Sequence, residues 1–108
     1  MRKFFFHDET QPVQFAEGAE RRVLAYSDSL MGVEVSFKKG AEGAMHAHPH
    51  EQISYIISGA FSFKNGGETK EVRAGDSILF APDVEHGVTC VEDGIILDIF
   101  APHRRDFL

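Results

Sequence analysis

The fold is first indicated by one stretch, Gly40-Ala-Glu-Gly-Ala-Met-His46-Ala-His48-Pro-His50-Glu-Gln52. His46 and His48 are two residues apart, and side chains with this spacing point to the same face of a β-strand. We therefore expect residues 45–48 to form a short strand that ends before Pro49 and presents two imidazoles together. Imidazole is a common ligand for divalent first-row metals, so this stretch predicts half of a metal site.

Working outward from this stretch, we expect many short strands separated by turns and no long helix. Residues 31–37 alternate between apolar and polar side chains, as in a strand with one buried face. Asn65-Gly66-Gly67 is a strong hairpin signal, because Asn and Gly accept positive φ. The other expected strands span residues 21–27, 52–58, 61–64, 68–72, 77–80, 86–91 and 95–101. This pattern is typical of an all-β sandwich or barrel.

The chain has 108 residues, of which 43% are hydrophobic and 26% charged, so we expect a single globular domain over residues 1–108. Residues 1–20 show little periodicity and are expected to form an N-terminal arm or edge strand. Phe4–Phe6 in this arm would pack on another subunit. Residues 102–108 are expected to form a C-terminal tail.

Composition excludes several classes of protein. The net charge is −6 and the basic residues are scattered, so no nucleic-acid surface is expected. An anionic small substrate would need a local cation to overcome this charge. No apolar run is long enough for a membrane helix, and Phe4–Phe6 is too short for a signal peptide. With Cys90 as the only cysteine, these features predict a soluble protein of the cytoplasm.

Two more residues complete a predicted ligand set for one divalent metal ion. Gln52 begins the next expected strand, and its amide oxygen is a neutral ligand that leaves the charge of the metal undiminished. His86 begins a later strand, which can pair back beside the first in an antiparallel barrel. Three imidazoles and one amide suit Zn, Ni, Mn and Fe(II) alike, and they leave room for water or substrate. His50 lies outside this pattern and is expected to face solvent.

Asp98 lies in the most apolar expected strand, Ile95–Ala101. A buried carboxylate must be paired, hydrated or protonated. If the face that Asp98 shares with Ile96 and Phe100 points inward, Asp98 lies near the metal and is a candidate proton carrier. Alternatively, it faces solvent or pairs with Arg104. Arg104 itself is either a solvated charge or folds over the barrel mouth to bind a carboxylate.

Residues 40–59 have the pattern G-x5-H-x-H-x3-Q-x6-G, which resembles the first motif of the cupins. Residues 75–90 resemble the second motif and keep Gly75 and His86. They depart from it at Ala81, Asp83 and Cys90, and Asp tolerates the left-handed conformation better than most residues. The resemblance implies a single-domain jelly-roll β-barrel of cupin type, which is often dimeric.

The tail Asp98–Leu108, the segment Arg21–Asp28 and the histidine stretch also resemble the KdgF family of cupins, the pectin-degradation proteins. That resemblance implies an enzyme that converts 4,5-unsaturated uronates, released by pectin or alginate lyases, into linear 5-keto-4-deoxyuronate. It implies His46, His48, Gln52 and His86 as metal ligands. It implies Asp98 and Arg104 as catalytic residues, and Phe100 and Arg104 as substrate-binding residues. The implied partners are a small anionic sugar acid and a second copy of the chain.

Two other functions remain open for a cupin with this ligand set. The first is a metal-dependent oxygenase, which would consume oxygen during turnover. The second is a sugar-acid-binding cupin without enzymatic activity. A tail with Asp98 and Arg104 favours a sugar acid as ligand over oxygen chemistry.

Overall fold

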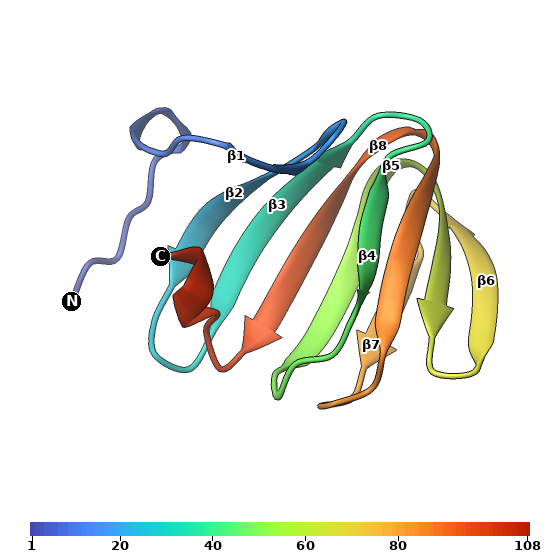
Figure 1. Cartoon of the computed structure of the whole chain (residues 1–108). Helices are drawn as coiled ribbons and strands as arrows, with labels where there is room; N and C mark the ends of the chain where they lie inside the picture. Colours follow the sequence, from blue (N-terminus) through green and yellow to red (C-terminus); the bar gives the residue numbers. More distant parts are fainter.

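Two long strands, β5 (Glu51–Asn65) and β8 (His86–Ala101), form the centre of the fold in the computed structural model of residues 1–108 (Figure 1). They pair antiparallel from Glu51↔Ala101 to Asn65↔His86. The remaining strands are β1 (Val13–Ala16), β2 (Ala19–Tyr26), β3 (Met31–Phe37), β4 (Glu42–His46), β6 (Glu68–Arg73) and β7 (Ser77–Phe80). The only helical segments are two short 3-10 turns, η1 (His7–Glu9) and η2 (Arg105–Phe107). The predicted all-β class is confirmed.

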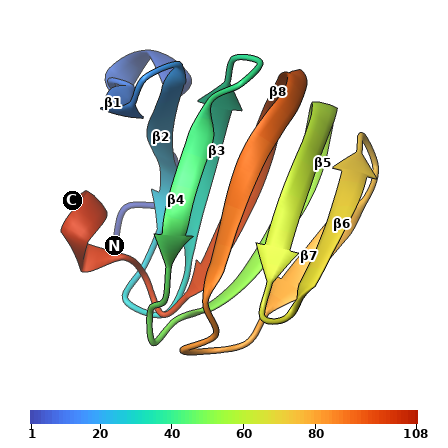
Figure 2. The same cartoon turned by 45° about the vertical axis from the view of Figure 1, so that its right-hand side comes forward.

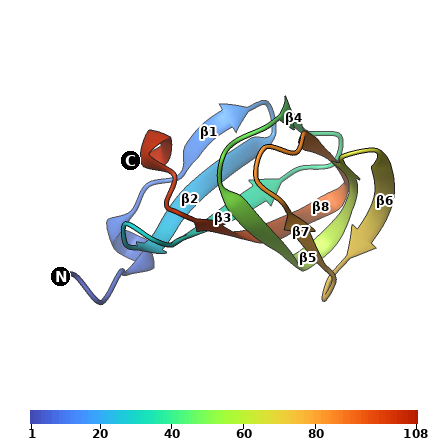
Figure 3. The same ribbon diagram turned by 90° about the horizontal axis from the view of Figure 1, so that it is seen from below.

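Each long strand belongs to two layers. The C-terminal half of β8 pairs with β3, which continues to β2 and β1, and the N-terminal half of β5 pairs with β7. The N-terminal half of β8 pairs with β4, and the C-terminal half of β5 pairs with β6. Figures 2 and 3 show how the strands curve around one interior. The predicted jelly-roll barrel is therefore the observed architecture.

The strand ends expected at residues 58 and 61 and at residues 91 and 95 are wrong, because β5 and β8 run through these positions without interruption. The pairing register shifts between Ile56 and Phe61, which marks bulges that bend both strands. Gly59 has a φ of +83°, and a Cβ added to Gly94 would lie only 2.1 Å from the carbonyl oxygen of Ser58. Some bulges, like many turns, contain a glycine with positive φ, so local sequence does not separate the two.

The core forms from alternate residues that face the interior. On β3, Met31, Val33, Val35 and Phe37 are buried, and the residues between them are more exposed. The alternation that predicted this strand is therefore confirmed, with the same bounds. The other large buried core side chains are Ile56, Phe61, Phe63, Phe80, Cys90, Ile96 and Phe100.

The N-terminal arm, the turn at Gly66–Gly67 and the conformation of Asp83 agree with the predictions from sequence. Residues 1–20 contain η1 and β1, and β1 lies at the edge of the sheet. The Gly66–Gly67 turn joins β5 to β6, and Gly66 has a φ of +62°. Asp83 adopts a φ of +66°, the left-handed conformation expected where the cupin motif has glycine. No helix has the length and apolar character needed to cross a membrane.

Candidate metal centre

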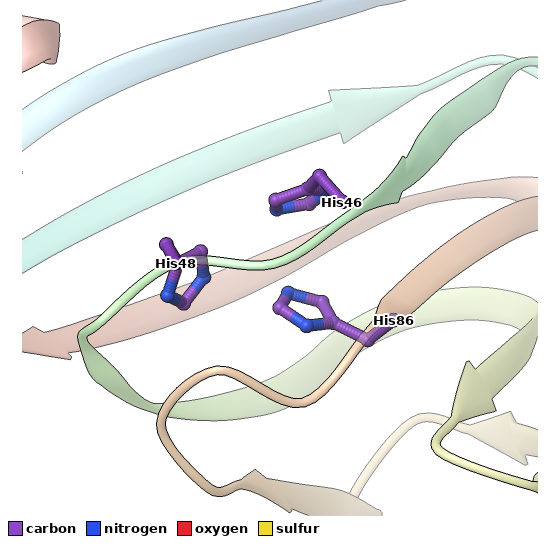
Figure 4. A group of neighbouring side chains, drawn as sticks. All are labelled: His46, His48 and His86. Carbon is purple, nitrogen blue, oxygen red and sulfur yellow. The ribbon is translucent and has the colours of Figure 1, made fainter.

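Three histidines from three segments come together at one end of the barrel (Figure 4). His46 ends β4 and is paired directly with His86, the first residue of β8. His48 closes the group from the loop after β4. One ring nitrogen of each histidine lies within 4.8 Å of the others, which is close enough to share one ion.

The strand that was predicted at residues 45–48 has the wrong bounds. β4 spans Glu42–His46, and His48 lies beyond its end. The two imidazoles therefore do not meet through strand alternation. The loop that contains Pro49 instead returns the chain to β5, and this return buries His48 while His46 stays exposed.

Backbone carbonyls fix the orientation of all three rings. Each Nδ1 lies within hydrogen-bond distance of a carbonyl oxygen, which only accepts, so Nδ1 carries the proton and Nε2 keeps its lone pair. The partners are Ala44 for His46 (2.8 Å), His50 for His48 (3.2 Å) and Val84 for His86 (3.0 Å). The three rings therefore have the tautomer that binds a metal through Nε2.

Two observations at this group fit a bound cation. The Nε2 of His86 is buried and has no hydrogen-bond partner. The Nε2 of His48 lies 3.0 Å from the Oε1 of Gln52, so two acceptors face each other. Two donors that share one ion at about 2.1 Å are separated by about 3.0–3.4 Å. His46, His48, Gln52 and His86 therefore fit a divalent first-row metal.

A chain of hydrogen bonds connects Gln52 to Asp98. The amide nitrogen of Gln52 donates to the Oγ of Ser54 at 3.0 Å, which turns Oε1 toward His48. Ser54 in turn donates to the carboxylate of Asp98 at 2.5 Å. Ser54 is fully buried and was not among the predicted site residues. The sequence could have indicated Ser54 as a site residue, because it lies on the inward face of β5 between Gln52 and Ile56.

Asp98 faces the interior rather than solvent. It is partly buried as a residue and lies opposite Ser54 across the pair of long strands. Burial raises the pKa of its carboxyl group to about 6, although hydrogen bonds from Ser54 and Gln52 and the charge of Arg104 oppose the rise. The alternative pairing with Arg104 is not formed, because Arg104 pairs with Asp106.

Burial has the opposite effect on two of the histidines. It lowers the pKa of His86 to about 4 and also lowers the pKa of His48. Neighbouring imidazoles and Arg104 act in the same direction. Both rings are therefore neutral near pH 7, which is the form that binds metal.

Phe100 and Arg104 lie beside the histidines. Phe100 is buried, and its ring meets that of His48 edge to face with centroids 5.8 Å apart. The guanidinium of Arg104 lies 5.1 Å from the Phe100 ring centroid. Its Nε and Nη2 donate to the carboxylate of Asp106 at 3.1 and 2.9 Å. The Arg104 side chain is only 12% exposed, so its charge is held close to the site.

His50 was expected to face solvent, and this expectation is wrong. The residue is partly buried, and its ring packs against His48 and Phe100 with centroids 5.2 and 6.3 Å apart. Its Nε2 lies 3.1 Å from the carbonyl oxygen of His103, and its Nδ1 is buried without a partner. Residues 48 and 50 lie in a loop, so strand alternation does not apply to them.

Comparison with known proteins agrees with this geometry. Residues 33–100 match the model of the cupin domain. Over the full length of both chains, the sequence is 39% identical to the pectin degradation protein KdgF of Dickeya dadantii (strain 3937). The structure of KdgF from Halomonas sp. superimposes with a TM-score of 0.93 and 34% identity, and all of both chains is covered. An RmlC-like cupin from Shewanella frigidimarina also gives a TM-score of 0.93, with 40% identity over 100% of this chain and 97% of that one. The chain therefore belongs to the cupins and, among them, to the KdgF family.

Proposed function

We propose that this protein acts in pectin or alginate degradation and converts 4,5-unsaturated uronates to linear 5-keto-4-deoxyuronate with the help of one divalent metal ion. The observation that supports the proposal is that four candidate metal ligands lie together with Asp98 and Arg104 at one end of the barrel. A metal bound to His46, His48, Gln52 and His86 would supply a Lewis acid for the oxygen that becomes negative at C5.

Arg104 is the residue that we assign to the substrate carboxylate. The whole chain carries a net charge of −6, so binding an anion requires a local cation. Asp106 accepts from Nε and Nη2 of the guanidinium, and no hydrogen bond from Nη1 is formed within the chain. Arg104 can therefore keep its contact with Asp106 and still donate to a carboxylate. Phe100 would offer its ring to the sugar.

Asp98 is the residue that we assign to the proton. When the hemiacetal ring of the substrate opens, a proton must reach C4 to give the ketone. A carboxyl group whose pKa is about 6 exchanges protons readily near neutral pH. Ser54 donates a hydrogen bond to one oxygen of this carboxyl group and so orients it. Addition of water at C5 before ring opening would use the same groups.

The test follows the absorbance of the conjugated double bond of an unsaturated monouronate. We expect the metal-loaded protein to accelerate its loss over the spontaneous reaction, and a chelator to abolish the effect. Asp98→Asn should retain metal and lose turnover by about 100-fold or more, the usual contribution of acid–base catalysis. Asp93→Asn, on the same strand but exposed, is the matched control. No acceleration with any unsaturated uronate would remove the proposal, and oxygen uptake during turnover would favour the oxygenase.

We also propose that the chain forms homodimers through the outer face of β5, β7 and β8. Ile53, Tyr55, Ile57 and Leu79 are 43–60% exposed. Ile53 is paired with Leu79 on one side and with Ile99 on the other, so these side chains form one continuous patch. Soluble monomers seldom expose such patches unless they bind a partner.

Finally, we propose the cytoplasm as the site of action. Cys90 is the only cysteine, and it is buried in the core without a disulfide. A reducing compartment suits a protein of this composition.

A further inference from the structure

The residue that precedes Arg104 is held from several sides. The ring Nδ1 of His103 donates to the carbonyl oxygen of Asp28 at 2.9 Å, in the turn between β2 and β3. The same ring stacks on Tyr26, with an interplanar angle of 9° and centroids 6.5 Å apart. These contacts fix the side chain of His103. The carbonyl group of His103, which sets the direction of the chain toward Arg104, is held by a different contact.

That contact comes from His50. Its Nε2 lies 3.1 Å from the carbonyl oxygen of His103, across 53 positions of sequence. A carbonyl oxygen only accepts, so the proton of the neutral ring is on Nε2. The backbone oxygen of His50 also binds Nδ1 of the metal-site residue His48. One residue thus touches both the metal centre and the tail.

The position of Arg104 depends on this arrangement. Its guanidinium lies against Phe100 and, at 4.3 Å, against the ring of Phe107, which in turn contacts Arg21 of β2. The tail is short, so its course over the sheet is set by its start at His103 and by the contact of Phe107. A tail released at its start would let the cation leave its position beside the metal centre.

We infer that His50 is a positioning residue, whose Nε2–H holds the carbonyl group of His103 and thereby places Arg104 beside the metal centre. The inference rests on the proposed function only for the consequence in catalysis. The structural part, that His50 orders the tail, stands on the contacts above. The sequence alone left His50 without a role.

The chemistry of the ring supplies a matched pair of variants. The side-chain amide of glutamine reaches the position of Nε2 and can donate to His103, whereas asparagine reaches only the position of Nδ1. Nδ1 has no partner in the structure, so glutamine loses no contact there. His50→Gln should therefore preserve the hydrogen bond to His103, and His50→Asn should lose it. His7→Asn, at an exposed histidine, controls for the effect of replacing a histidine by asparagine.

The first measurement needs no substrate. Hydrogen–deuterium exchange of the C-terminal peptide is followed by mass spectrometry in the full-length, metal-loaded protein. We expect exchange in His50→Asn to be about fivefold faster or more, the factor that one hydrogen bond is worth. His50→Gln and His7→Asn should match the wild type, and all variants should bind the same amount of metal.

The second measurement is steady-state turnover of an unsaturated monouronate. His50→Asn should raise KM about fivefold or more and change kcat less, because the lost element is the position of a binding cation. Unchanged hydrogen exchange in His50→Asn would overturn the inference. Faster exchange or a raised KM in His50→Gln but not in His50→Asn would also overturn it. Loss of metal in His50→Asn would assign the residue to the metal centre instead. An inactive wild type would refute the proposed function and leave the exchange result to decide the role of His50.

Discussion

Burial at the barrel mouth moves the pKa of Asp98 upward and that of His86 downward. Both shifts favour the uncharged form, because the interior solvates charge poorly. Without metal, the two residues therefore make opposite contributions to the pH dependence of folding. Between about pH 4 and 6, the folded chain holds a proton on Asp98 that the unfolded chain releases, whereas His86 is protonated only after unfolding.

This opposition gives a prediction for the metal-free protein. The stability associated with Asp98 is full at low pH and is lost as the pH rises through about 6, whereas that associated with His86 is lost as the pH falls toward about 4. Asp98→Asn should therefore lose stability more steeply than the wild type when the pH falls from 6.5 to 4.5, by up to about 2 kcal/mol. His86→Gln should lose it less steeply. Urea unfolding at several pH values measures both, with His7→Gln as the control. If the free energy of unfolding depends on pH in the same way in all four proteins, the pKa shifts of Asp98 and His86 are contradicted.

Ser54 carries the second prediction at the scale of single residues. Replacement by alanine removes the acceptor of Gln52 and the donor to Asp98 at once. Loss of such a supporting contact typically costs about 10–100-fold in metal affinity or activity. We expect Ser54→Ala to lower kcat and metal affinity within this range. Metal titration and turnover measure the effect, and Ser62→Ala on the same strand is the control. If Ser54→Ala has the kcat and metal affinity of the wild type, the side chains of Gln52 and Asp98 are oriented without Ser54.

At the scale of elements, the bends in β5 and β8 decide where the site forms. Because both strands continue past Gly59 and Gly94, each one reaches from one layer into the other. Gln52 near the start of β5 and His86 at the start of β8 thus belong to different layers and still face the same interior. Separate short strands in place of β5 and β8 would not hold Gln52 and His86 in different layers that face the same interior.

The close approach of the two bends can be tested with alanine. A Cβ on Gly94 would lie 2.1 Å from the carbonyl oxygen of Ser58, and backbone must move to relieve the contact. We expect Gly94→Ala to destabilise the protein by about 2 kcal/mol or more. Gly67→Ala, where an added Cβ meets nothing within 4 Å, should change stability little. Denaturant midpoints measure both, and equal midpoints would show that the bend tolerates a side chain.

At the scale of the whole molecule, the proposed metal ties together β4, β5, β8 and the loop that contains His48. A ligand that binds only the folded state at 100 times its dissociation constant adds about 2.7 kcal/mol to stability. For a domain of this size, about 1 kcal/mol moves the melting temperature by about 4–8 °C. We therefore expect chelation to lower the melting temperature by about 10 °C or more. The same treatment should leave His86→Ala, which lacks one ligand, nearly unchanged. Equal melting with and without chelator would argue against a bound metal.

The outer apolar patch gives the last prediction. Leu79→Glu places a charge in the patch, and burying that charge unpaired would be costly. We expect the wild type to run as a dimer and Leu79→Glu as a monomer in size-exclusion chromatography with light scattering. Leu30→Glu, at another exposed leucine, should remain dimeric. A monomeric wild type would exclude the proposed interface.

Much of this protein was predictable from local sequence. Alternation along residues 31–37 gave β3 its bounds, and Asn65-Gly66-Gly67 gave the hairpin between β5 and β6. The spacing of His46, His48, Gln52 and His86, together with the resemblance to cupins, indicated a metal centre. The strand and the hairpin are local features, because side-chain direction and turn conformation depend on a few neighbouring residues. The metal centre was indicated by the motif resemblance, since strand alternation does not bring His46 and His48 together.

Tertiary structure decided the rest. Whether Gly59 ends a strand or bends it depends on Gly94, which lies on the other long strand. Ser54 is a site residue only because β8 brings Asp98 opposite it, and His50 acquires a partner only because the tail returns to it. Asp98 could face either way until the two layers closed around it. Contacts between residues far apart in sequence form only when the barrel closes, so the motifs predicted the fold and the ligands, whereas closure determined the surroundings in which they act.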